Sequence, residues 1–262
     1  MPPTAPAPPM SYAEVPPPPD LAPWIAALWT FRIVPEAGEI EHRIPLTGGV
    51  MLSAGADGEP ALVGPRTAPL TTTVRGGDVF RGVHLRPGAA GALLHVSAGA
   101  LRDAIGPARL WLDPVWCDLW RAQAAIADDA AALSGLAGAF RELASRAAPL
   151  DDAVAMVVDR LIRSHGTARL DELAAEAALS PRQLRRRFRA AVGLSPKELA
   201  RIRRLRAAAA SAAVEDRPWA DLVADGGYAD QPHLVREFRR LLGVTPGGFG
   251  QHARRIDHRL VD

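Results

Sequence analysis

An internal repeat in the last third of the chain constrains its fold most strongly. The segment LAAEAALSPRQLRRRFRAAVGLSP (173–196) aligns without gaps to VADGGYADQPHLVREFRRLLGVTP (223–246). Matched apolar, basic and glycine positions are Leu184, Arg186, Phe188 and Gly193 in the first copy and Leu234, Arg236, Phe238 and Gly243 in the second. Two copies are too few for a solenoid, which needs about three repeats to share a core. The repeat therefore predicts two units of helix, tight turn and helix.

Each copy carries the signals that begin and end its second helix. Ser180 followed by Pro181 is an N-cap with proline at the first helical position, and Gly193 ends the helix. Asp230 and Gly243 take the same places in the second copy. The pattern predicts second helices over 181–192 and 231–242, first helices over 171–177 and 218–225, a helix over 151–164 before them, and one connecting helix over 195–213.

Each second helix has one apolar face and one face rich in arginine and glutamine. Arginine and glutamine pair with guanine and adenine edges in the major groove, and further arginines bind phosphates. The alternative is two solvated faces, but their agreement in register favours DNA. The candidate DNA contacts are Ser180, Arg182, Gln183, Arg185, Arg186 and Arg189 in the first unit and Gln231, His233, Arg236 and Arg240 in the second.

Charge and cysteine content agree with this interpretation. The net charge is +2, but residues 150–262 carry 20 Lys+Arg and 15 Asp+Glu, whereas the preceding residues are net acidic. This asymmetry, unless it is chance, indicates a polyanion-binding module joined to another domain. The single cysteine excludes an internal disulfide and a multi-cysteine zinc site. Without a signal-peptide pattern or an apolar run of membrane-spanning length, we expect a cytoplasmic, nucleoid-associated protein.

The repeat resembles the DNA-binding domain of the AraC/XylS family of bacterial transcription regulators over about 100 residues. The second copy carries the resemblance with Gly227-Tyr228, Asp230, Leu234, Arg236-Glu237-Phe238, Gly243-Val244-Thr245-Pro246 and Phe249. The resemblance implies sequence-specific DNA binding through both second helices. Pro232 falls at one of the implied contact positions and offers no donor, so Gln231 and Arg236 are expected to carry the specificity of the second unit.

The N-terminal half is patterned differently. Short apolar runs separated by Gly and Pro predict strands over 25–34, 40–44, 49–54, 61–63, 70–74 and 79–85, typical of a small antiparallel barrel or sandwich. Helices are predicted over 89–96, 100–105, 114–127 and 129–147. Leu62-Val63-Gly64-Pro65 and the segment 82–90 resemble a sensor-like domain of unassigned function found in some of these regulators.

The predicted fold class is therefore α+β. We expect a disordered Pro-rich arm over 1–20, a β-rich effector or dimerisation domain with a helical tail over 21–148, a double helix-turn-helix domain over 150–250 and a C-terminal tail over 251–262. The expected partners are double-stranded DNA, an unidentified small-molecule effector, RNA polymerase if the protein activates transcription, and a second copy through the N-terminal domain.

Other residues offer weaker candidates. His84 and Arg86 alternate along a predicted strand, so both face one side and could line a ligand pocket, although a solvated sheet face is the alternative. No histidine or carboxylate spacing predicts a metal site, and no cofactor is expected. Cys117 lies beside Asp118, which disfavours a reactive thiolate, so a packed helix thiol is expected.

Two other functions stay open at this stage. An enzyme with an appended DNA-binding domain, such as an alkyl-transfer repair protein, would need a nucleophilic cysteine beside a base, which Cys117 lacks. An architectural DNA-binding protein would coat unrelated DNA uniformly, whereas a regulator would protect a site of about two turns on a specific promoter.

Overall fold

The computed structural model describes residues 8–55, 58–214, 223 and 226–260. Its N-terminal half is built on a seven-stranded sheet in the order β8-β5-β4-β7-β2-β1-β9. These strands are β1 (Met10–Val15), β2 (Ile25–Ile33), β4 (Met51–Ala54), β5 (Pro60–Val63), β7 (Val79–Leu85), β8 (Ile105–Pro107) and β9 (Ile256–Leu260). The described strands form an open sheet with β8 and β9 at its edges, so the sandwich alternative is the one observed.

A second sheet covers one face of the first. It pairs β3 (Glu39–Ile44) with β6 (Leu70–Arg75) in antiparallel register, from Glu39 opposite Arg75 to Ile44 opposite Leu70. Ile40 and Val74 of this sheet share a buried cluster with Trp29 and Phe31 of the large sheet. The strands predicted between residues 25 and 85 are thus confirmed, and they close over one apolar core.

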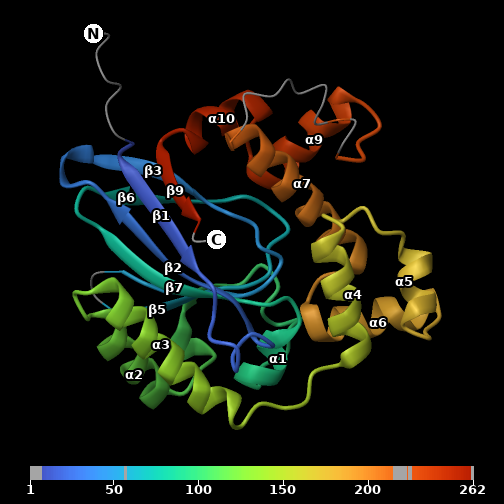
Figure 1. Ribbon diagram of the computed structural model, residues 1–262, viewed down its shortest axis with the longest axis horizontal. Coiled ribbons are helices and arrows are strands. Elements are labelled where there is room, and N and C mark those ends of the chain that lie inside the picture. Colours follow the sequence, from blue (N-terminus) through green and yellow to red (C-terminus); the bar gives the residue numbers. More distant parts are fainter. Residues whose placement is uncertain (1–7, 56–57, 215–222, 224–225, 261–262) are drawn as a thin grey trace.

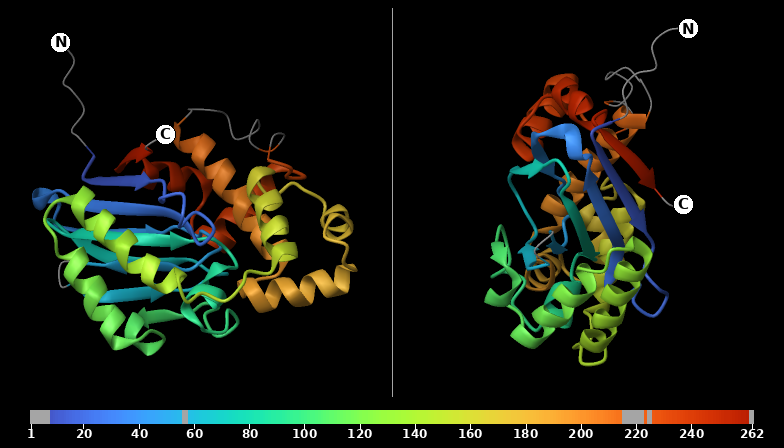
Figure 2. Two further views of the ribbon diagram at one scale, coloured as in Figure 1. Left: turned by 60° about the horizontal axis from the view of Figure 1, so that its bottom comes forward. Right: turned by 90° about the vertical axis from the view of Figure 1, so that its left-hand side faces the viewer.

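Helices cover the opposite face of the large sheet (Figure 1). They are α1 (Ala89–Leu94), α2 (Pro114–Ala124) and α3 (Asp129–Ala144), and two short 3-10 turns lie over Pro35–Ala37 and Ala108–Leu110. Trp120 and Phe140 of these helices are fully buried and share a cluster with Leu52 and Val83 of the sheet. Figure 2 shows α2 and α3 lying along the sheet, whereas α1 contacts α6 (Pro181–Val192) of the C-terminal half.

Three segments differ in the structure from what their sequence predicts. Residues 10–15, expected in a disordered arm, form β1, because Met10 packs into the sandwich core and the strand pairs with β2 from Met10–Ile33 to Val15–Leu28. Residues 100–103, expected in a helix, form turns, with Asp103 at a left-handed φ of 55°. The segment expected as a C-terminal tail contains β9, which pairs in parallel with the free edge of β1.

The C-terminal half is helical as predicted. It contains α4 (Asp152–Arg163), α5 (Leu170–Glu176), α6 (Pro181–Val192), α7 (Pro196–Val214), α9 (Gln231–Leu242) and α10 (Pro246–Ala253). The predicted first helix of the second unit, 218–225, lies outside the described residues apart from Val223. These helices share one core, and Leu46 from the N-terminal half packs into it. Among the described helices, none has the length and hydropathy needed to cross a bilayer.

Candidate DNA interface

The first candidate recognition helix is α6, and its N-terminus forms a complete capping box. The Gln183 backbone N–H donates to Ser180 Oγ over 3.2 Å, and the Ser180 backbone N–H donates to Gln183 Oε1 over 2.9 Å. Pro181 takes the first helical position and Gly193 ends the helix at a φ of 79°. The predicted bounds of this helix, 181–192, are therefore confirmed.

The second candidate recognition helix, α9, begins in a related way. The His233 backbone N–H donates to Asp230 Oδ1 over 2.6 Å, and the Ala229 N–H donates to His233 Nδ1 over 3.4 Å. The His233 ring also packs edge-on against Tyr228, with centroids 5.4 Å apart. His233, predicted to contact DNA, is therefore half-buried and engaged with the residues that lead into α9.

The inner faces of both helices are fixed by packing and by ion pairs. Phe188 and Phe238 are fully buried at matched positions of the repeat. On α6, Arg187 Nε and Nη2 donate to the Asp151 carboxylate over 2.8 and 2.7 Å. On α9, Glu237 is 8% exposed and accepts both hydrogen bonds of Arg201 from α7. These contacts determine which faces of α6 and α9 point away from the protein.

The outer faces carry the predicted DNA contacts. The exposed side chains are Ser180, Arg182, Gln183, Arg185, Arg186 and Arg189 on the first unit and Gln231, Arg236 and Arg240 on the second. Within the described part of the chain, no ion pair or hydrogen bond occupies the guanidinium groups of Arg182, Arg185, Arg186, Arg189 or Arg240. Exposed, unpaired guanidinium groups on a helix face can bind base edges or phosphates without first breaking an internal contact.

One continuous helix joins the two units. α7 has 19 residues and runs between α6 and α9 (Figures 1 and 2). Arg204 of this helix donates from Nη1 to the Gly227 carbonyl over 3.3 Å and lies 6.0 Å from the centre of the Tyr228 ring. Sequence reasoning did not single out Arg204, because nothing in the local pattern of α7 distinguishes it from its arginine neighbours.

The structure gives the two candidate ligand residues different surroundings. His84 is buried in the sandwich core, where its ring stacks on Trp29 at 5.6 Å and its Nε2 lies 3.1 Å from Tyr12 Oη. Burial lowers the pKa of His84 to about 3, so the imidazole is neutral at pH 7. Arg86 instead lies at the junction with α4 and donates to Asp159. Their contacts do not converge on one pocket.

Two further observations bear on other chemistry. Cys117 is 2% exposed in α2, and burial, together with the nearby Glu59 carboxylate, raises the pKa of its thiol. A protonated, buried thiol is a poor nucleophile. In the described residues, no group of three or more histidine, cysteine, aspartate or glutamate side chains is placed to hold a metal ion.

Comparisons with known proteins also divide the chain into an N-terminal and a C-terminal domain. A family model described as a domain of unknown function (DUF6597) matches residues 13–107, and one described as a helix-turn-helix domain matches residues 173–252. No curated protein matches the sequence.

The solved structures that match the chain are distant from it in sequence. The C-terminal domain of AraT, a response regulator from Geobacillus stearothermophilus, is 20% identical over 44% of this chain and 92% of that chain, with a TM-score of 0.37. ToxT from Vibrio cholerae is 10% identical over 82% of this chain and 97% of that chain, with a TM-score of 0.47.

The matched helix-turn-helix domain contains both copies of the repeat, and both copies form capped helices with buried phenylalanines and outward-facing arginines. The chain therefore carries a helix-turn-helix domain, as its resemblance to the AraC/XylS regulators predicted, and a domain of unknown function precedes it.

Proposed function

We propose that this protein is a DNA-binding transcription regulator that reads two adjacent major grooves of one DNA duplex, with α6 in the first groove and α9 in the second. The observation that carries the proposal is the pair of matched helices joined by the continuous helix α7. The 19 residues of α7 span roughly 28 Å at 1.5 Å per residue. Successive major-groove faces lie ~34 Å apart, so a single chain has the necessary reach.

The contacts within the first unit divide into base-reading and phosphate-binding groups. Arg182 and Arg186 lie four residues apart on the exposed face, in the N-terminal half of α6, where recognition helices meet base edges. Arg185 and Arg189 form a second exposed pair that we assign to phosphates. Ser180 Oγ and Gln183 Oε1 are engaged in the capping box, which leaves the Gln183 amide N–H groups for DNA.

The second unit depends on fewer side chains. Gln231 and Arg236 are both exposed, and Arg236 Nη2 lies 3.9 Å from Asp230 Oδ1, which orients it along the helix start. Arg240, one turn further on, is assigned to a phosphate. His233 is assigned a positioning role, because its ring is held against Tyr228.

The N-terminal domain is proposed to modulate DNA binding, because it contacts the DNA-binding helices in several places. Arg86 donates to Asp159 of α4, and Arg206 of α7 donates to the Leu46 carbonyl over 3.4 Å. The strand β9, which follows the second unit, joins the N-terminal sheet. An effector or partner that moves the sandwich would therefore move the DNA-binding helices.

Selection of binding sites from random DNA tests the two-groove proposal. The wild-type protein should enrich two short sequence blocks about one helical turn apart. Arg186→Ala should weaken one block only, and Arg236→Ala the other only. Enrichment of a single block in the wild-type selection would contradict two-groove reading, and recovery of unenriched DNA would favour an architectural role.

A further inference from the structure

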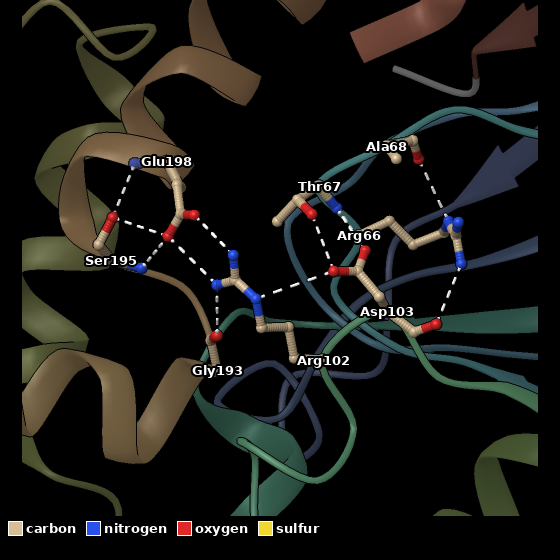
Figure 3. Close-up of polar contacts among 8 residues, drawn as sticks. All are labelled: Arg66, Thr67, Ala68, Arg102, Asp103, Gly193, Ser195 and Glu198. Atoms are coloured by element: carbon tan, nitrogen blue, oxygen red, sulfur yellow. Dashed lines mark hydrogen bonds and ion pairs between the residues drawn. The ribbon is translucent and has the colours of Figure 1, made fainter. Parts of the chain in front are cut away.

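Arg102 connects the N-terminal domain to the joint between α6 and α7 (Figure 3). Its Nη1 donates to the Gly193 carbonyl over 3.1 Å, directly after the end of α6. Its Nη2 donates to Glu198 Oε1 over 2.7 Å, in the first turn of α7. One guanidinium group thus holds the end of the first recognition helix and the beginning of the connecting helix together.

Glu198 is itself part of the start of α7. Its Oε2 accepts hydrogen bonds from the Ser195 backbone N–H and from Ser195 Oγ, each over 2.7 Å. The hydrogen bond from Arg102, together with those from Ser195, lowers the pKa of Glu198 to about 2 despite partial burial. Glu198 is therefore a carboxylate at neutral pH, and its contact with Arg102 is a charge-assisted hydrogen bond.

The loop that carries Arg102 is held by hydrogen bonds to the segment that follows β5. Asp103, at a φ of 55°, accepts hydrogen bonds from the Thr67 backbone N–H over 2.7 Å and from Thr67 Oγ1 over 2.8 Å. Arg66 Nη1 donates to the Asp103 carbonyl over 3.3 Å, and the Gly64 N–H donates to the Ala104 carbonyl over 2.9 Å. These hydrogen bonds join the loop to the segment after β5, so the backbone on either side of the Arg102 side chain is fixed to the N-terminal domain.

Close packing surrounds the same joint. A Cβ atom at Gly193 would lie 2.4 Å from the Ala98 carbonyl oxygen and 3.5 Å from Pro65 Cγ. The helix end therefore has little room to shift against the N-terminal domain. The same N-terminal segment also reaches the second unit, since a Cβ atom at Gly243 would lie 3.3 Å from Pro69 Cγ. Residues 65–69 thus adjoin the stop residues of both recognition helices.

We propose that Arg102 is a positioning residue for DNA reading. By holding Gly193 and Glu198 together, it sets the angle between α6 and α7, and hence the placement of the first recognition helix relative to the second. Arg102 does not touch DNA in this scheme. The inference rests on the proposed two-groove reading, and it adds the residue that sets the spacing of the two blocks.

The test measures binding of purified full-length protein to a series of duplexes. One duplex carries both sequence blocks at the selected spacing, others shift the blocks by one to three base pairs, and one carries the α6 block alone. Arg102→Ala removes the guanidinium. Glu198→Gln keeps an oxygen that can accept from Ser195 but removes the charge that Arg102 binds. Arg109→Ala is the matched control, because Arg109 pairs with Glu59 inside the N-terminal domain.

Arg102→Ala and Glu198→Gln should each bind the selected spacing about tenfold more weakly, with the loss shrinking as the spacing departs from it. Binding to the single α6 block should change less than about twofold, because that contact needs no fixed angle. Arg109→Ala should match the wild type on every duplex. Thermal unfolding of each variant identifies loss of folded protein, which lowers binding to all duplexes equally and leaves the spacing preference intact.

Three results would overturn the inference. An unchanged spacing preference in Arg102→Ala would show that the contact is only a structural ion pair. Tighter binding of Arg102→Ala to the selected spacing would show that the contact holds the helices away from DNA. A wild-type protein with no spacing preference would remove the proposed two-groove reading, and the inference with it.

Discussion

Arg186→Ala separates DNA contact from protein stability. Arg186 is exposed on α6, and no ion pair or hydrogen bond in the described part of the chain involves its side chain. Its removal should therefore leave the thermal unfolding midpoint unchanged. A bidentate arginine contact with a base is worth ~1–3 kcal/mol of discrimination, which corresponds to roughly 5- to 150-fold in Kd on the specific site.

The neighbouring residue provides the control. Arg187 lies on the inner side of the same helix and donates two hydrogen bonds to Asp151, at 2.8 and 2.7 Å. Arg187→Ala should lower the unfolding midpoint and leave the Kd for specific DNA close to that of the wild type. The two substitutions remove the same charge from adjacent positions, so any difference in binding reflects the direction in which the side chain points.

Fluorescence anisotropy with the selected site and with random DNA of equal length measures both effects. Arg186→Ala should weaken specific binding much more than random binding, since a lost base contact affects only the specific site. Equal losses on both DNAs would show that Arg186 binds a phosphate. Equal losses in Arg186→Ala and Arg187→Ala would refute the assignment of the outer face of α6 as the DNA interface.

Three further predictions concern the fold that supports this interface. The free energy of unfolding should fall between pH 4.5 and 2 as Glu198 is protonated. The pKa of Glu198 is about 2 in the folded protein and 4.5 ordinarily, so its stabilising contribution is complete above pH 4.5 and is lost as the pH falls. Glu198→Gln should lack this contribution in acid titration. Gly193→Ala should destabilise more than Gly77→Ala in urea unfolding, by ~1 kcal/mol or more, because both have positive φ but only Gly193 would place a Cβ against a carbonyl oxygen. Phe188→Ala should cost ~3–5 kcal/mol in urea unfolding, because the ring is fully buried, and a loss below ~1 kcal/mol would contradict its place in the core.

The recognition helices could be predicted from the sequence because their signals are local. Ser180, Pro181 and Gly193 lie within or next to α6, and each acts on backbone groups a few residues away. The same holds for Asp230 and Gly243 around α9. Where capping residues and apolar spacing agree, helix bounds follow from short-range chemistry.

The remaining features depend on partners distant in the chain. β1 was not predicted, because proline-rich segments flank it in the sequence and because one of its partner strands, β9, is distant in the chain. Residues 100–103 form turns although their sequence pattern predicts a helix, because Thr67 donates two hydrogen bonds to the carboxylate of Asp103. Arg102 has no local signature, since its role depends on where α6 and α7 meet the N-terminal domain. Sequence patterns do not contain such long-range geometry.

The most direct test of the central claim is a hydroxyl-radical footprint on the selected site, combined with measurement of the number of chains bound per duplex. The account predicts that one chain protects the sugar-phosphate backbone around two adjacent major-groove segments on one face of the DNA, with centres about one helical turn apart. Protection of a single segment per chain, with the second segment appearing only when a second chain binds, would contradict it.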